Sequence, residues 1–424
     1  MRYLLCLTLF VSLTLSSFAQ LKEAAPETVG ASSERLKRID NLLQEYIDKK
    51  WVGGATAIVV KDGKIIYYKA LGLSDLDNKT AMKKDAIFRI ASQTKAITSV
   101  AIMMLYEEGK LLLDDPVSRY IPSFANQKVL DKFNEADSSY ITVPAKRAVT
   151  IRDLLTHTSG IGYAQIGSKE ATAIYAKNGI WGGIGVENGM ILGDKIKVLG
   201  TLPLLHQPGE QWTYGLNSDI LGYVIEVLSG MSLDAFFKTR IFEPLGMKDT
   251  YFYLPKEKYS RLVTLNTEDK NREVVTMKES LNISGKININ YPAAPGTYYS
   301  GGGGLSSTAL DYAIFMQMLV NNGEYNGKRI LSPFAIRMMT TSQFDKLNWP
   351  DTKMGLGFSL YTDKSVARSP LSPGSFEWGG MFSSTYWIDP KEKLVAQLFL
   401  NQYPNSHGEI HDKFKVAVYQ TLER

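Results

Sequence analysis

The chain has 424 residues, of which 44% are hydrophobic and 21% charged, and its formal net charge is +5. These proportions are ordinary for a globular protein, so disordered and fibrous classes are excluded, and the length allows one large domain or two modest ones. The charge is too mild to indicate nucleic-acid binding, and no Lys/Arg cluster interleaved with aromatic residues is present.

The N-terminus has the pattern of a secretory signal peptide. Arg2 precedes an apolar stretch from Leu4 to Leu15, and a small-x-small pattern ends at Ala19, so we predict cleavage of residues 1–19. About 12 apolar residues are too few to span a bilayer, which makes an uncleaved anchor the less favoured alternative. We therefore expect a secreted or periplasmic protein with no stable membrane span.

Cleavage after Ala19 would also remove Cys6, which is the only cysteine. The remaining residues, 20–424, would then carry a net charge of +4, because Arg2 is the only charged residue among the first 19. Disulfides, cysteine nucleophiles and thiolate metal sites are excluded for such a chain.

Residues 32–72 predict a helix followed by a hairpin. Leu36, Ile39, Leu43 and Tyr46 recur at helical spacing in the first part. Two β-branched and aromatic runs then surround Asp62-Gly63 in the stretch ATAIVVKDGKIIYYKALG, which is a strong hairpin signal.

The remainder of the chain alternates between the two periodicities. Residues 92–249 are mostly helical in pattern, with long loops, and a further helix is expected over 309–321. The stretch SSTYWIDPKEKLVAQLFLNQ predicts two strands joined by a turn that begins at Asp389-Pro390, and the last 16 residues predict a closing helix.

Strands near both ends with helices between them predict an α+β fold in one body. We expect one antiparallel sheet built from both termini and flanked by helices, with an inserted mostly helical region. The α/β part would comprise about 20–100 and 310–424, and the mostly helical part about 101–309. No repeat or Pro/Ser-rich linker divides residues 20–424 into independent domains.

The stretch RIASQTKAITSV contains the only S-x-x-K sequence in the chain, at Ser92 and Lys95. In a helix these side chains lie on one face, so the amine can approach the hydroxyl. A lysine can act as the base that a serine nucleophile needs when desolvation or a nearby cation lowers its pKa, and amides at a helix start favour an oxyanion. An isolated S-x-x-K is more often a helix cap with a solvated lysine.

The wider sequence resembles the serine β-lactamase and penicillin-binding-protein superfamily, in its class C-like branch and closest to β-lactamase-like serine carboxylesterases. The resemblance is carried, in chain order, by FRIASQTKAITSVAIMMLYEEGKLLLDDPVSRYIP, AKRAVTIRDLLTHTSGIGY, HQPGEQWTYGLNSDILGYVIEVLSG, IFEPLGMKDTYF, GGGGLSSTALDYAIFMQML and FEWGGMFSSTYWIDPKEKL. It implies the β-lactamase/transpeptidase-like fold, with Ser92 as nucleophile and Lys95 as its general base or acid.

The second motif of this superfamily is Y-x-N or S-x-N. Tyr214 takes its first position, but Leu216 stands where the asparagine is expected and Asn217 comes one residue late. The resemblance implies that Tyr214 shares proton transfer with Lys95. The departure removes the amide that usually helps to hold a substrate's acylamino group.

The third motif, K-T-G, is absent at the matching position, which reads Trp378-Gly379-Gly380, as in the esterase members. The resemblance implies that these three residues bind substrate and that the Met381 backbone N–H is an oxyanion donor beside that of Ser92. Arg368, which precedes this strand, is a candidate for replacing the missing cation.

Other hydrolase chemistries fit less well. No G-x-S-x-G sequence is present for an α/β-hydrolase, and the four histidines lack the spacing of a zinc site, so we expect no metal and no cofactor. His157 is expected to serve loop structure near the site.

These observations predict a serine hydrolase that acts through an acyl-enzyme, with short-chain or neutral esters as its favoured substrates. The alternatives are a D-alanyl-D-alanine carboxypeptidase acting on cell-wall-peptide-like substrates, or a weak class C-like β-lactamase. A non-catalytic binding module on the same fold is less favoured, because Ser92, Lys95 and Tyr214 are all present.

Overall fold

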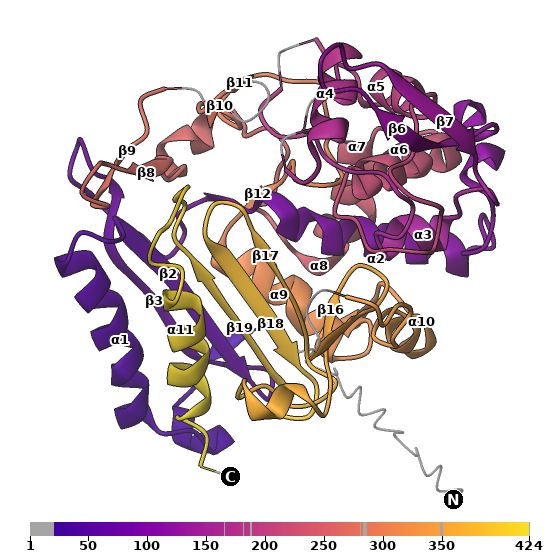
Figure 1. Ribbon diagram of the computed structural model, residues 1–424. Coiled ribbons are helices and arrows are strands. Elements are labelled where there is room, and N and C mark those ends of the chain that lie inside the picture. The colour runs from indigo at the N-terminus through magenta and orange to yellow at the C-terminus, as the bar shows by residue number, and fades with distance from the viewer. Residues whose placement is uncertain are drawn as a thin grey trace, which may run out of the picture.

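A central sheet takes strands from both ends of the chain (Figure 1). In the computed structural model its order is β1-β3-β2-β19-β18-β17-β16-β15, with β4 paired to β3. The bounds are β1 Lys22–Glu23, β2 Gly54–Lys61, β3 Lys64–Asp75, β4 Thr80–Ala81, β15 Thr352–Met354, β16 Ser359–Tyr361, β17 Phe376–Gly380, β18 Ser384–Asp389 and β19 Leu394–Phe399.

The structure describes residues 21–164, 166–180, 182–186, 189–279, 281–282, 286–347 and 351–423. The expected signal peptide lies outside these residues and stays a prediction.

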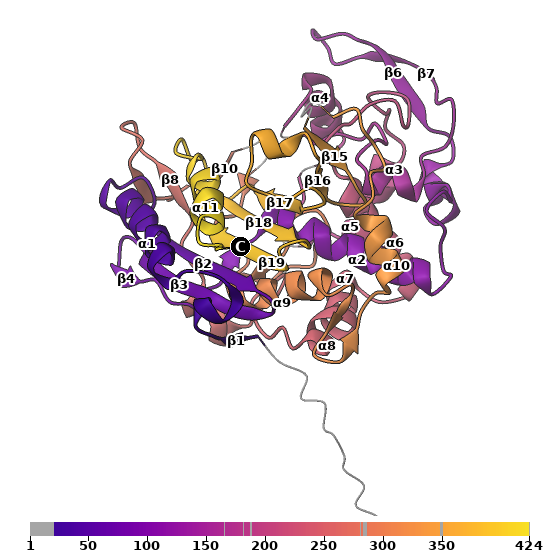
Figure 2. The same ribbon diagram turned by 90° about the horizontal axis from the view of Figure 1, so that it is seen from below.

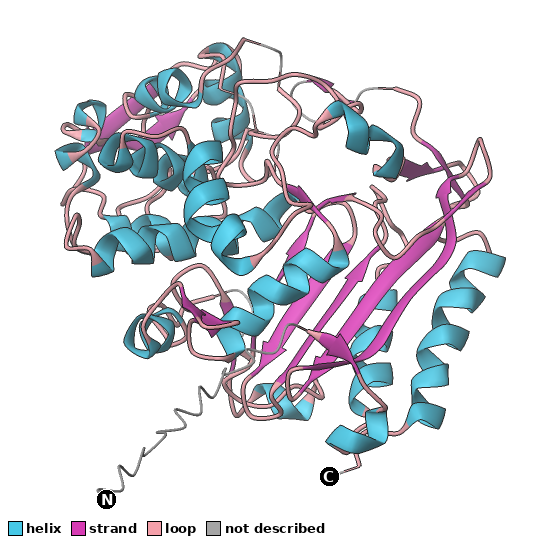
Figure 3. Ribbon diagram, turned by 180° about the vertical axis from the view of Figure 1, so that it is seen from behind, coloured by secondary structure: helices cyan, strands magenta, loops and turns pink. Residues whose placement is uncertain are grey.

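Helices cover both faces of the sheet (Figures 2 and 3). Helices α1 (Ser33–Asp48) and α11 (Ile410–Tyr419) pack on one face, and α9 (Ala309–Val320) packs on the other against β2, β18 and β19. The core is divided accordingly, because the residues of β2 and β19 alternate between the cluster under α1 and α11 and the larger cluster under α9 and α2. The fold is therefore α+β, as the sequence predicts.

Both predicted turns are confirmed. Asp62 and Gly63 join β2 to β3 with φ values of 49° and 71°, the left-handed pair that a two-residue type I′ hairpin needs. The turn after Asp389 joins β18 to β19 in continuous antiparallel register. One pairing departs from the expected antiparallel sheet, since the short edge strand β1 runs parallel to β3.

The inserted region is mostly helical and lies beside one end of the sheet (Figure 1). Its helices are α2 Thr94–Glu107, α3 Ile151–Leu155, α4 Lys169–Lys177, α5 Leu192–Leu199, α6 Asn217–Ser229, α7 Leu233–Phe237 and α8 Glu243–Leu245, and α10 Pro333–Met339 follows α9. Among the described residues no single helix has the length and apolar composition to cross a membrane, and only α6 together with Leu233–Leu245, bent by 79°, passes that test as a pair.

Small two-stranded sheets within and beside this region were not predicted. They pair β5 Phe88–Arg89 with β12 Ser306–Ser307, β6 Lys128–Phe133 with β7 Tyr140–Pro144, β8 Asn266–Glu268 with β9 Val274–Thr276, β10 Leu281–Asn282 with β11 Lys286–Ile287, and β13 Glu324–Tyr325 with β14 Lys328–Arg329. Most residues of β6 and β7 are exposed or half-buried, so no alternating apolar pattern marks these strands in the sequence.

A buried arginine fastens the segment before Ser92 to a distant part of the chain. The Arg89 guanidinium donates hydrogen bonds to the carbonyl oxygens of Tyr291 (2.5 Å), Ile289 (2.6 Å) and Val263 (2.9 Å). Burial lowers the pKa of Arg89 to about 10, so the side chain stays charged at neutral pH.

Replacing Arg89 with methionine should lower the free energy of unfolding by at least about 2 kcal/mol, because three buried carbonyls lose a charged donor. Urea denaturation measures this change. Arg329→Met is the matched control, because that exposed guanidinium also donates to backbone carbonyls, and its effect should stay within about 0.5 kcal/mol. Equal effects of the two variants would contradict this account of Arg89.

Candidate active site

Ser92 lies in a tight turn at the start of α2. The turn is a single 3-10 segment, Ala91–Gln93, and Ala91 has a φ of 44°, an unusual conformation for a residue with a side chain. Gln93 fixes the turn from two sides, since its carbonyl accepts the Tyr312 hydroxyl from α9 (2.9 Å) and its side chain accepts from Gln397 of β19 (3.0 Å). The nucleophile position is therefore held by elements from the far end of the chain.

Lys95 follows one turn later and is almost fully buried. Its ammonium nitrogen lies 3.1 Å from Ser92 Oγ, as the S-x-x-K spacing predicts, 3.1 Å from the Tyr163 hydroxyl and 2.5 Å from the Gly302 carbonyl oxygen. A lysine ammonium has three donors, so each has an acceptor here. The Lys95 nitrogen is accordingly held in a fixed position beside Ser92.

Tyr214 also contacts Ser92. Its hydroxyl donates to Ser92 Oγ at 2.7 Å, and the Lys95 nitrogen lies 4.8 Å from the centre of its ring. The serine oxygen therefore contacts two groups that can carry a proton.

Tyr163 was not predicted from the sequence, although it ends the quoted stretch that contains HTSGIGY. Its ring packs edge-on against Tyr214, with centroids 5.3 Å apart. Burial, with the neighbouring Tyr214 and Asp219, raises the pKa of Tyr163 well above its ordinary value. Tyr163 is thus a neutral phenol that accepts a hydrogen bond from Lys95.

A buried carboxyl group lies behind the same loop. Ser300 Oγ donates to Asp219 Oδ1 at 2.5 Å, and burial raises the pKa of Asp219 while the nearby Lys95 charge opposes that rise. A Cβ at Gly302 would lie 2.4 Å from Asp219 Oδ2. The glycine run 301–304 therefore approaches the site closely and presents the Gly302 carbonyl to Lys95.

The third-motif position lies on β17, next to the nucleophile turn. A Cβ at Gly380 would lie 2.4 Å from the Ile90 carbonyl oxygen, so only glycine allows this approach of the strand to the residues before Ser92. Met381 and Ser92 line one cavity, and among the described residues no backbone acceptor is bonded to either amide. This arrangement leaves both N–H groups available to an oxyanion.

The cavity beside Ser92 has a volume of about 270 Å³ and no charged side chain among the described residues that line it. Apolar side chains of Ile184, Ile287 and Met381 form part of its wall. Arg368 lines no part of it and instead pairs with Asp351 at 2.9 Å on the exposed surface. Within the described ranges, no group of three His, Cys, Asp or Glu side chains is placed to hold a metal ion.

Further aromatic rings pack against Tyr214. Trp378 lies with its ring centroid 5.8 Å from that of Tyr214 and 6.3 Å from that of His157, to which it is nearly parallel. His157 has a φ of 57° and is fully buried, and burial together with the Lys95 charge lowers the pKa of His157 well below its ordinary value. His157 is therefore neutral, and it packs in this cluster without contacting Ser92 through any hydrogen bond in the described structure.

The displaced asparagine of the second motif supports that histidine. Asn217 Oδ1 accepts the Ser159 hydroxyl at 2.5 Å, so its amide nitrogen is the donor that lies 2.9 Å from His157 Nδ1. Leu216, at the usual asparagine position, is buried in the core. The cavity therefore lacks the motif's amide, and the third acceptor on Lys95 comes from Tyr163.

Comparison with known proteins identifies the family to which a chain with this site belongs. A family model described as Beta-lactamase matches residues 39–420. The chain belongs to the beta-lactamase family. Esterase EstB of Burkholderia gladioli is 29% identical over 90% of this chain and 94% of its own, and a putative D-alanyl-D-alanine carboxypeptidase of Escherichia coli is 26% identical over 98% and 92%.

A solved structure, EstCE1, a hydrolase with promiscuous acyltransferase activity, superimposes on the chain with a TM-score of 0.79. It is 26% identical and covers 91% of this chain and 99% of its own. As a beta-lactamase family member with esterase relatives, the protein is a serine hydrolase.

The two tyrosines should differ in their effect on turnover. Tyr214→Phe removes the hydroxyl bonded to Ser92 and should lower kcat by about 10²–10⁴. Tyr163→Phe removes one of three acceptors on Lys95 and should cost only about 10-fold, which corresponds to ~1.4 kcal/mol. Steady-state assays with an activated ester measure both, and near-wild-type turnover of Tyr214→Phe would show that its hydroxyl carries no proton.

His157 should make the fold sensitive to acid. Because its pKa is depressed in the folded state, the unfolded chain binds a proton that the folded protein does not below pH ~6.5. Stability from this group is complete above that pH and falls as pH falls, by at most about 1.4 kcal/mol per unit.

His157→Asn, which tolerates the positive φ, should reduce this dependence. The measurement is urea denaturation of both proteins from pH 7 to 5. If the free energy of unfolding changes with pH equally in wild type and variant, the pKa of His157 does not differ between the folded and unfolded states.

Proposed function

We propose that the protein is a carboxylesterase that hydrolyses short-chain, neutral esters through an acyl-enzyme on Ser92. The observation that carries this proposal is the small cavity beside Ser92, whose described lining has apolar and hydroxyl groups and no cation. Such a pocket suits an uncharged acyl group, because a carboxylate placed there would lose water without gaining a charged partner. Esterase EstB and EstCE1, as relatives, support the same choice.

In this mechanism the Lys95–Tyr214 pair has lost one proton when the ester binds, and it takes the Ser92 proton as Oγ attacks the ester carbonyl. The amides of Ser92 and Met381 stabilise the negative charge that forms on the carbonyl oxygen. When the ester C–O bond breaks, the pair returns a proton to the leaving alcohol. A water molecule then attacks the acyl-enzyme by the reverse sequence of proton transfers and releases the acid.

A D-alanyl-D-alanine carboxypeptidase is the second candidate, favoured by the relative in Escherichia coli that carries this description. A carboxylate-bearing substrate needs a cation, and a charge-assisted contact of that kind contributes about 1.5–3 kcal/mol. Trp378 stands at the position of the K-T-G lysine and offers one N–H donor only. We place the peptidase and a weak β-lactamase activity below ester hydrolysis for this reason.

We also propose that the protein acts outside the cytoplasm, as a secreted or periplasmic enzyme without a membrane span after cleavage. The support for this is the sequence pattern of residues 1–19.

The ranking of substrates is tested by parallel assays of a 4-nitrophenyl ester, a D-Ala-D-Ala peptide and a chromogenic cephalosporin. We expect the ester to have the highest kcat/KM, and Trp378→Lys to narrow the difference while lowering ester turnover. A wild-type enzyme that hydrolyses the cephalosporin faster than the ester would reverse the ranking.

Ser92→Ala is the control, since it should abolish covalent labelling by a fluorophosphonate probe and leave the fold intact. Labelling of wild type and variant to the same extent, measured by intact mass, would remove Ser92 as the nucleophile.

A further inference from the structure

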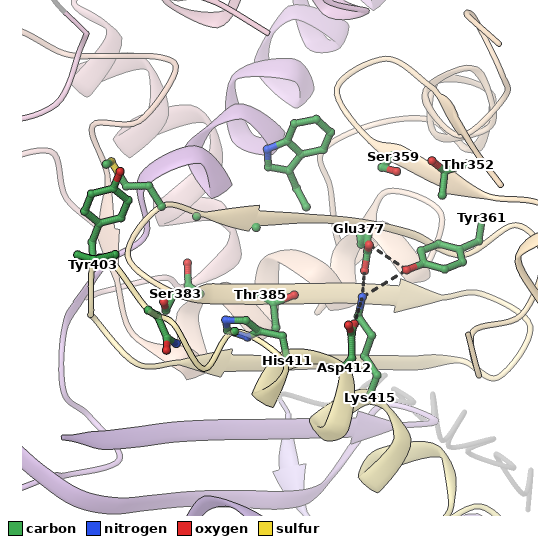
Figure 4. Close-up of a pocket in the computed structure, with 18 residues that line it drawn as sticks. Thr352, Ser359, Tyr361, Glu377, Ser383, Thr385, Tyr403, His411, Asp412 and Lys415 are labelled. Atoms are coloured by element: carbon green, nitrogen blue, oxygen red, sulfur yellow. Dashed lines mark hydrogen bonds and ion pairs between the residues drawn. The ribbon is translucent and has the colours of Figure 1, made fainter. Parts of the chain in front are cut away.

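A second and larger cavity, of about 940 Å³, lies on the α11 side of β17 (Figure 4). We call it the β17 groove, and define it by Glu377, Gly379, Thr385, Asn405, His411 and Lys415. It shares Met381 and Tyr403 with the cavity beside Ser92, so the two hollows meet at the end of β17. A molecule held at Ser92 can therefore extend into the groove.

The groove exists because of a missing side chain and a short helix. A Cβ at Gly379 would meet only the Ser384 carbonyl oxygen, at 3.1 Å, and would otherwise point into open space. Helix α11 begins at Ile410 and leaves the neighbouring end of β17 and β18 uncovered. Thr385, opposite Gly379 in the sheet, forms part of the floor (Figure 4).

The charges at one end of the groove neutralise each other. Lys415 Nζ lies 2.7 Å from Glu377 Oε2 and 3.3 Å from the Tyr361 hydroxyl, which donates to Glu377 Oε1 at 2.9 Å (Figure 4). Lys415 is the only cationic lysine or arginine among the described lining residues, and this pairing occupies it. Asp412 adds a negative charge at the exposed rim, so the groove does not favour an anion.

Neutral polar side chains, among them His411 and Asn405, also line the groove. His411 Nδ1 and Asn405 Nδ2 are buried and have no hydrogen-bond partner among the described residues. Burial and the nearby Lys415 charge lower the pKa of His411 to about 4, so its ring is neutral at pH 7. The hydroxyl groups of Ser383 and Thr385 add further hydrogen-bond donors and acceptors. The lining therefore favours a neutral ligand over a cation or an anion.

The position of Tyr214 indicates which of the two cavities receives the alcohol of the ester. The alcohol oxygen must lie near Tyr214 to receive a proton, and Tyr214 packs against Trp378, which also lines the groove. The cavity beside Ser92, at about 270 Å³, is smaller than pockets for drug-sized ligands, which are about 300–1,000 Å³. The small apolar cavity thus suits the acyl group, and the larger groove, whose lining includes polar side chains, suits the alcohol.

We propose that the β17 groove binds the alcohol portion of the ester, and that this portion is a neutral, hydroxyl-rich group of the size of a disaccharide. The inference rests on the proposed esterase function. In the reaction the bond between the acyl carbon and the alcohol oxygen breaks, the bond from that carbon to Ser92 Oγ forms, and the alcohol leaves through the groove with the proton taken from Ser92.

The test compares two acetyl esters, 4-nitrophenyl acetate and a monoacetylated disaccharide, on the full-length mature enzyme. Asn405→Leu and Thr385→Leu each replace a polar group of the groove. Each should lower kcat/KM for the disaccharide ester at least about 10-fold, in line with the loss of one or two hydrogen bonds, and change that for 4-nitrophenyl acetate less than 2-fold. Val416→Leu, on the exposed side of α11 and away from the groove, is the matched control and should change neither.

Equal losses on both esters would show that the groove only supports the fold, and unchanged values for both would show that the alcohol does not enter it. If the enzyme hydrolyses an O-acetylserine dipeptide faster than the disaccharide ester, the sugar-like alcohol in this proposal is wrong and the groove binds a peptide instead. Failure of wild type to hydrolyse 4-nitrophenyl acetate would instead overturn the proposed esterase function. Thermal unfolding of both groove variants confirms that each is folded before the comparison is made.

Discussion

The buried ammonium group of Lys95 is the constraint on which the active site depends. A charge removed from water has to be surrounded by oxygen acceptors, and here these come from Ser92, Tyr163 and Gly302, three segments far apart in the chain. The glycine run brings its carbonyl to this point only because it has no side chains to keep it away from Asp219. The positions of the loop, the helix and the second tyrosine therefore follow from one requirement.

Trp378 and Leu216 alter the electrostatics of the site together. At the usual lysine position of the third motif stands an indole that packs against Tyr214, and at the usual asparagine position stands a core leucine. The asparagine that comes one residue later holds His157, and so supports the aromatic cluster from behind. Each departure removes a polar contact for a charged or amide-bearing substrate, and the cavity that results is apolar.

Local spacing made part of this site predictable. The three-residue separation of Ser92 and Lys95 fixes their approach within one helical turn, and the glycines at 379 and 380 indicate a close strand. Tyr163 could not be found in this way, because its contact with Lys95 depends on the path of a long loop. The sheet was predicted from its hairpins, whereas the parallel edge strand β1 has two residues and no pattern to identify it. The β17 groove could not be predicted from the sequence either, because it depends on where α11 begins relative to β17.

The pairing of β2 with β19 has a consequence for how the enzyme is made. These neighbours are separated by more than 330 residues in sequence, and the side chain of Gln397 on β19 helps to hold the turn at Ser92. Contacts of such long range slow folding, because a large loop has to close before they form. A chain still emerging from the ribosome lacks the strand that completes both its sheet and its nucleophile turn. Synthesis and assembly of the catalytic serine are thus separated in time, and the hydrolase stays inactive until its last strand is in place.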